Sequence, residues 1–180
     1  MGEILSSIWV TTVSEFSDIP DVAQATRIVI RLSMAIILGA AIGYERELRG
    51  KAAGLRTHML VSLGAAIFIL VPLQSHMEVA DASRVLQGII AGVGFLGAGA
   101  IIKFNSDGEI KGLTTAASVW VAAAIGIAAG MGLEATAVVS TLAALFILAV
   151  VKRVEDSIQV TPDTDEKNAT SNNEPADKTE

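Results

Sequence analysis

The sequence predicts an all-α fold, a polytopic membrane helix bundle of about five transmembrane helices with glycine-rich packing faces. The 180 residues are 52% hydrophobic and have a mean hydropathy of +0.56, which is high for a soluble domain. Several uncharged runs approach the roughly 20 residues that a helix needs to cross a bilayer. Glycines recur four residues apart within these runs, a spacing that lets two membrane helices approach closely.

Composition also limits the chemistry that the chain performs. It contains no cysteine, so disulfide bonds and thiolate metal sites are excluded. No nucleophile–base pair and no metal-ligand spacing stands out, so we expect no enzyme activity and no cofactor. The net charge of −6 is divided unevenly between the tail and the loops. The expected surroundings are a lipid bilayer, and we expect no nucleic-acid partner.

The N-terminal segment, residues 1–21, is predicted to be amphipathic. It contains no basic residue, whereas a secretory signal peptide has a positively charged start. Its apolar side chains recur at helical spacing, at Ile4, Leu5, Ile8, Trp9, Val13 and Phe16. We therefore expect a short helix that lies at the membrane surface.

The first span is expected from about residue 22 to residue 44. Arg27 and Arg31 lie four residues apart in its first third, so they share a helix face. Arg31 lies deeper in the membrane; it either snorkels to the interface or faces the bundle and pairs with an acid or a carbonyl. Gly39 and Gly43 form a GxxxG pair that predicts a helix-packing face.

The densest polar stretch, residues 44–58, reads YERELRGKAAGLRTH. Its cations are expected in a cytosolic loop, but a topology signal does not require the carboxylates Glu45 and Glu47. These carboxylates indicate either a salt-bridge network with the neighbouring arginines or a site for a hard cation. The second span is expected over residues 57–73, with Pro72 marking its end.

The central span is predicted within the stretch RVLQGIIAGVGFLGAGAIIK, residues 84–103. Arg84 and Gln87 are expected to be polar residues at membrane depth. Gly88 and Gly92 form a second GxxxG pair. We predict that this pair is a helix-packing seam. The alternative is a helix that loosens within the membrane and turns backbone groups toward a cavity.

Residues 113–151 carry a single charge, Glu134, and their length suits two further spans that are separated by a turn at residues 130–134. Gly126 and Gly130 form a third GxxxG pair and predict another packing face. Trp120 is expected to pack inside the bundle, because it lies too deep for an interfacial tryptophan.

The remaining polar residues suggest one site. At the start of the fourth span the hydroxyl groups of Thr114, Thr115 and Ser118 either bond back to the helix or line a polar entry. We predict a polar cluster at the cytosolic mouth of the bundle. Its expected members are Glu45, Arg46, Glu47, Arg56, His58, Thr114 and Thr115.

Charge sets the expected orientation. With the N-terminus outside, ten of the 13 cations lie in the cytosol, and only Arg27, Arg31 and Arg84 lie toward the outside. The chain is thus expected to comprise a segment over residues 1–21, a membrane domain over residues 22–153 and an acidic polar tail over residues 154–180. The tail lacks the apolar residues to form a core, so we expect it to be mostly disordered.

Three motifs in this order resemble the membrane domain of the MgtC/SapB family: ERELRGKAAGLRTHMLVSLGAA, RVLQGIIAGVGFLGAGAIIK and GLTTAASVWVAAAIGIAAGMG. The resemblance covers roughly residues 23–151. It implies a bacterial inner-membrane protein that is linked to magnesium homeostasis, to growth in low magnesium and to virulence. It also implies a regulator that restrains another membrane protein, the F-type ATP synthase. Many family members have a soluble C-terminal domain where this sequence has a polar tail.

Two functions follow from the sequence. In the first, the chain is a regulator whose glycine-faced helices dock on another membrane protein or on a second copy. In the second, it is a transporter or channel for a small ion or solute. The spans hold too few acidic residues to strip Mg²⁺ of its waters, and Arg31 and Arg84 would sooner suit an anion path.

Overall fold

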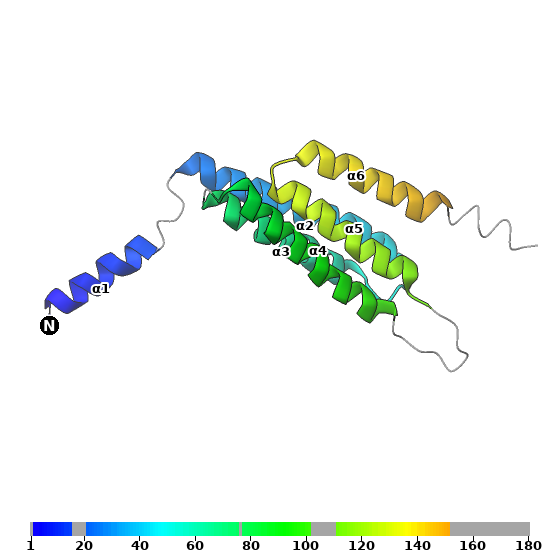
Figure 1. The fold of residues 1–180 in the computed structure, drawn as a ribbon, viewed down its shortest axis with the longest axis horizontal. Helices are drawn as coiled ribbons and strands as arrows, with labels where there is room; N and C mark the ends of the chain where they lie inside the picture. Colours follow the sequence, from blue (N-terminus) through cyan, green and yellow to red (C-terminus); the bar gives the residue numbers. More distant parts are fainter. Residues whose placement is uncertain (1, 16–20, 76, 102–110, 152–180) are drawn as a thin grey trace, which may run out of the picture. The chain divides into compact units, whose positions relative to one another are not determined.

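The structure, a computed structural model, describes residues 2–15, 21–75, 77–101 and 111–151. The expected tail, residues 154–180, and the last two residues of the central stretch, 102–103, lie outside the described residues. Six α-helices follow one another along the described chain, and these residues contain no strand (Figure 1). The helices are α1 (Gly2–Glu15), α2 (Val22–Leu48), α3 (Leu55–Gln74), α4 (Val79–Ile101), α5 (Leu113–Gly130) and α6 (Glu134–Phe146). The all-α prediction is confirmed.

The helix ends follow local chemistry. The Asp21 side chain accepts a hydrogen bond of 2.6 Å from the backbone N–H of Gln24, which caps the start of α2. Gly50 adopts a positive φ of 61° just after α2, where glycine turns the chain at little cost. The helix α3 runs to Gln74 and includes Pro72, so the end that was expected at Pro72 lies slightly early.

Four helices are long and apolar enough to cross a bilayer: Val22–Leu48, Leu55–Gln74, Ala80–Ile101 and Leu113–Gly130. A fifth apolar helix, Glu134–Val150, is shorter. It follows a tight turn in which Gly132 has a φ of 80°. The last described residues, Ile147–Val151, form a π-helical turn. The chain is therefore a multi-pass membrane protein, with four full-length spans and one shorter apolar helix.

The helix α3 lies between two glycine pairs of other helices. On the α2 side, a Cβ atom at Gly39 would lie 2.7 Å from the His58 carbonyl oxygen, and one at Gly43 would lie 2.7 Å from the Leu55 Cα. On the α5 side, a Cβ atom at Gly130 would lie 2.6 Å from the Ala66 carbonyl oxygen. Real side-chain atoms do not approach a backbone this closely, so glycine alone lets α2 and α5 pack directly on α3.

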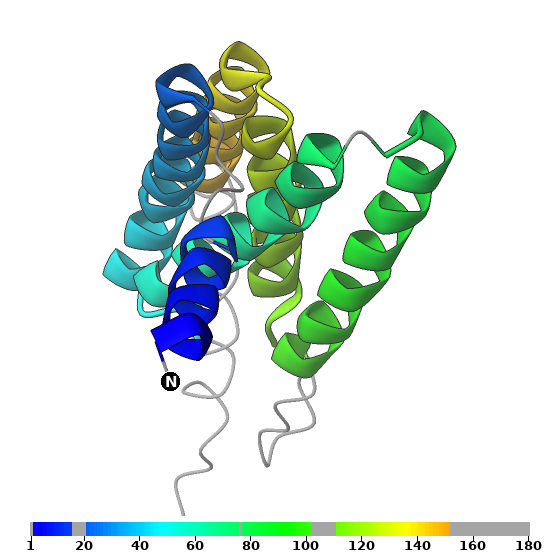
Figure 2. The same ribbon diagram turned by 90° about the vertical axis from the view of Figure 1, so that its left-hand side faces the viewer.

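The helix α4 lies at the edge of this group, mainly against α5 (Figure 2). Its Ile89 and Val93 side chains are buried. The neighbouring glycines, Gly88 and Gly92, have no atom of another helix within 4 Å of an added Cβ. The packing seam predicted for these two glycines is therefore not formed between the described helices. The alternative of a loosened helix is also not seen, because α4 is continuous through both glycines.

Two outer features complete the fold. The helix α1 forms where the apolar stripe predicts it, and none of its residues is buried. Trp120 on α5 is 49% exposed, so the prediction that it packs inside the bundle is wrong. Its neighbours Val119 and Ala122 take the buried face of α5 instead, because one residue of a helix turns the side chain by about 100°.

Candidate functional site

Five polar side chains, four of them buried, gather where the end of α2 meets the starts of α3 and α5. Glu45 and Arg46 come from α2, His58 from α3, and Thr115 and Ser118 from α5. His58 is 0% exposed, Arg46 is 2% exposed, and Thr115 and Ser118 are each 4% exposed. We call these five residues the polar junction. Buried polar groups within membrane-spanning helices are costly and mark candidate functional sites.

His58 joins two helices at the centre of the polar junction. Its Nδ1 lies 2.8 Å from the carbonyl oxygen of Gly54, and its Nε2 lies 3.0 Å from the hydroxyl oxygen of Ser118. The Ser118 hydroxyl also lies 2.8 Å from the carbonyl oxygen of Thr115. The ring therefore links the chain entering α3 to the first turns of α5.

The charged part of the polar junction lies on the last turn of α2. An Arg46 guanidinium nitrogen lies 3.6 Å from a Glu45 carboxylate oxygen, and Arg49 forms a second ion pair with the same carboxylate. The carboxylate is thus shared between two cations, as the salt-bridge interpretation of this stretch predicts.

Several buried atoms near the polar junction lack a hydrogen-bond partner in the structure. They are Arg46 Nε and Nη2 and the hydroxyl oxygen of Ser62, one turn beyond His58 on α3, whereas the Glu45 oxygens take part in the ion pairs with Arg46 and Arg49. Most buried polar groups in proteins are hydrogen-bonded, and unmet groups often mark functional positions. The polar junction therefore has N–H donors on Arg46 beyond those that its own fold uses.

Three of the predicted cluster residues lie outside the polar junction. Glu47, Arg56 and Thr114 are exposed. Glu47 has a local role, because its carboxylate accepts a hydrogen bond of 2.7 Å from the backbone N–H of Leu55 at the start of α3. The prediction also omitted Ser62, although it follows His58 by four residues and so shares a helix face with it.

The polar residues expected within the membrane behave differently from one another. Arg31 donates a hydrogen bond of 3.3 Å to the Gly130 carbonyl oxygen, so it faces the bundle and pairs with a carbonyl. Arg84 is largely exposed and forms an ion pair of 3.3 Å with Asp81 on the first turns of α4. Gln87 is exposed on the same helix.

The Ser118–His58 contact has the atoms of a nucleophile and a base, which the sequence did not reveal. Both side chains are enclosed between packed helices, and the Ser118 hydroxyl also contacts its own helix backbone. A hydrolytic site needs room for a substrate beside the hydroxyl. The described residues also contain no group of three or more His, Cys, Asp or Glu side chains that could hold a metal ion.

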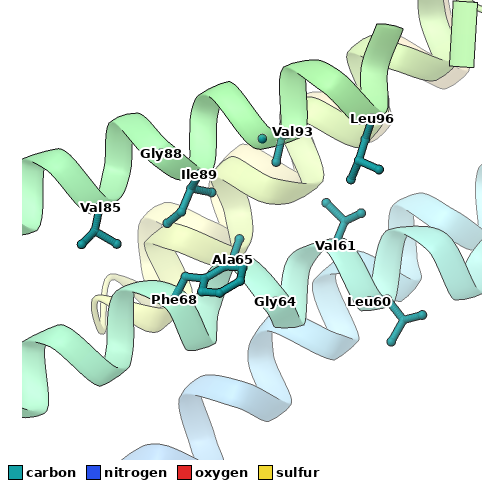
Figure 3. Close-up of a pocket in the computed structure, with 11 residues that line it drawn as sticks. Leu60, Val61, Gly64, Ala65, Phe68, Val85, Gly88, Ile89, Val93 and Leu96 are labelled. Carbon is teal, nitrogen blue, oxygen red and sulfur yellow. The ribbon is translucent and has the colours of Figure 1, made fainter. Parts of the chain in front are cut away.

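A separate groove, lined by apolar side chains and glycines, lies between α3 and α4 (Figure 3). Its volume is about 650 Å³. Phe68 and Val61 on α3 face Ile89 and Val93 on α4 across it (Figure 3). Gly64 on α3 and Gly88 and Gly92 on α4 complete its walls, so both sides of the groove present bare backbone.

Comparison with known proteins gives one family. The model of the MgtC family matches residues 32–157, which include the whole polar junction and the groove. Protein SrpB of Synechococcus elongatus is 40% identical over 136 residues, which make up 69% of this chain and 75% of SrpB. No solved structure matches this chain.

Two further relatives are longer than this chain. YhiD of Escherichia coli K12, whose name marks it as a candidate magnesium transporter, is 46% identical over 100 residues, covering 52% of this chain and 46% of YhiD. Protein MgtC of Salmonella typhimurium is 42% identical over 92 residues, covering 51% of this chain and 38% of that protein. The chain therefore matches less than half of either relative.

Proposed function

Because this chain belongs to the MgtC family, we propose that it is a non-enzymatic bacterial inner-membrane protein that regulates another membrane protein during adaptation to low magnesium. The groove between α3 and α4 carries this proposal. It is open at the surface that the four full-length spans present to lipid or to a partner, and it offers no group for chemistry. A surface of this kind serves binding.

The groove suits a transmembrane helix of the partner. Its α4 wall extends from Val85 to Leu96, which is about 16 Å of helix and half the thickness of a bilayer core. Gly88 and Gly92 would let the incoming backbone approach α4 closely, as small residues do at membrane helix interfaces. The occupant that we propose is a helix of the F-type ATP synthase, the enzyme that the family resemblance indicates. A second copy of this chain is the alternative occupant.

A transporter or channel for a small ion is the second candidate function. The charged polar junction at the ends of three spans favours it, as does the name of the relative YhiD. A flux assay of the purified protein in liposomes, with Mg²⁺, phosphate and H⁺ tested in turn, separates the two functions. We expect no flux above that of protein-free liposomes. Flux of any one of these ions would contradict the regulatory function and support the transporter function instead.

We further propose that the N-terminus faces outward and the C-terminus faces the cytosol. The loop between α2 and α3 then lies in the cytosol with the majority of the cations. Cysteines placed singly at Lys51 and Lys167 should both resist an impermeant thiol reagent in intact cells and react after lysis. Labelling of Lys51→Cys from outside would show that the orientation is the opposite of the one proposed. Labelling of Lys167→Cys alone would show that the short helix α6 does not cross the membrane.

A further inference from the structure

The contacts of the His58 ring determine where its protons lie. Nδ1 lies 2.8 Å from the Gly54 carbonyl oxygen, and a carbonyl oxygen only accepts hydrogen bonds. Nδ1 therefore carries a hydrogen and donates it to Gly54. A neutral imidazole has a single N–H group, so Nε2 of the neutral ring has a free lone pair.

The Ser118 hydroxyl faces this lone pair, and its single hydrogen has two acceptors. The hydroxyl oxygen lies 3.0 Å from Nε2 and 2.8 Å from the Thr115 carbonyl oxygen. While the ring is neutral, the hydroxyl donates to one of these acceptors at a time. When Nε2 carries a hydrogen, it donates to the hydroxyl oxygen and the hydroxyl donates to Thr115. Only the protonated ring satisfies both contacts at once.

We propose that Nε2 of His58 is a proton-binding site inside the polar junction, with Ser118 as its hydrogen-bond partner in both protonation states. Accommodating the new N–H group on Nε2 requires at most rotation of the Ser118 hydroxyl, which then donates to Thr115. This matters here, because the backbone of α3 at His58 is in close contact with α2 at Gly39. The proposal does not depend on the regulatory function.

The groups packed around the His58 ring include charges of both signs. From α2, the charged groups nearest the ring are Glu45 and Arg46, which form an ion pair with each other. From α5, the groups against the ring are the neutral Ser118 and Thr115. On its own helix, the nearby Arg56 is exposed to solvent. Histidine is the side chain whose charge ordinarily changes closest to neutral pH. Protonation of His58 would thus add a positive charge beside the Glu45–Arg46 pair.

The test is nitrogen NMR of the full chain with ¹⁵N-labelled histidine in detergent micelles. The chain has two histidines, and a His76→Asn background leaves His58 as the single signal source. At about pH 8 we expect a protonated Nδ1 and a bare Nε2, the reverse of the tautomer that free histidine prefers in water. On titration to about pH 5 the Nε2 signal should move to that of a protonated nitrogen while the protein stays helical and monodisperse.

Two variants link this titration to the structure. Ser118→Ala removes the acceptor for the Nε2 hydrogen, so protonation should require more acid than in the parent. Thr141→Ala is the matched control, because it deletes another buried hydroxyl that donates 2.8 Å to a helix carbonyl, that of Ala137. It should leave the His58 titration unchanged. An N–H on Nε2 at about pH 8, loss of the fold before Nε2 is protonated, or an unchanged titration in Ser118→Ala would each overturn the proposal.

Discussion

Replacing Gly126 with leucine is expected to abolish the folded protein. A Cβ atom at this position would overlap the backbone of Ser62 on α3, including its carbonyl oxygen. Overpacking against movable side chains costs about 1–3 kcal/mol. Here the obstacle is a helix backbone, and α5 would have to move away from α3 along their shared contact. The yield of monodisperse protein in mild detergent and its thermal melting curve measure the loss.

The matched control is Gly92→Leu, which makes the same chemical change in another glycine of a GxxxG pair. An added Cβ at Gly92 meets no atom within 4 Å among the described residues, so this variant should keep the yield and melting temperature of the parent. Equal loss in both variants would show that Gly92 also packs on a helix of this chain or of a second copy. Normal folding of Gly126→Leu would contradict the close packing of α5 on α3.

Gly92→Leu is nevertheless expected to lose the regulatory effect that we propose for this chain. The new side chain would occupy the groove between α3 and α4, where Gly92 now leaves the backbone bare. A partner helix could then no longer approach α4 closely. The measurement is the activity of the F-type ATP synthase in vesicles that contain both proteins, with parent and variant present at equal, verified amounts.

Gly94→Leu is the control for this loss of activity. Gly94 lies on the same helix, is exposed and also has open space around an added Cβ, but it does not line the groove. The two variants therefore add the same bulk to two faces of one helix. Regulation should survive in Gly94→Leu. Loss of regulation in both variants, or in neither, would show that the groove is not the docking surface.

The sequence predicted the positions of the helices well, but it did not predict which helix packs against which. Hydropathy and length locate the apolar runs, because lipid requires both. The GxxxG spacing identifies a face that a helix could approach, but it does not say which helix does so. Gly39 and Gly126 approach α3, a helix without such a pair, whereas Gly88 and Gly92 face open space. Which faces meet depends on how the whole bundle packs.

The sequence also predicted only part of the candidate site, because it shows which residues are polar but not which of them are buried. Charged residues at a span end are conspicuous against an apolar background, and this signal led to Glu45, Arg46 and His58. It could not separate the buried Arg46 from the exposed Arg56, because both lie in the same polar stretch. Likewise Thr114 and Thr115 are adjacent in sequence, but one step along a helix separates an exposed face from a buried one.

One measurement tests most directly whether this chain acts on another membrane protein, as we propose. Purified F-type ATP synthase is reconstituted into vesicles with and without the wild-type chain, and ATP-driven proton pumping is followed with a pH-sensitive dye. We predict slower pumping when the chain is present, and recovery of the full rate when Gly92→Leu replaces it. An unchanged pumping rate with the folded wild-type chain in the same vesicles would contradict the proposed regulation of the ATP synthase.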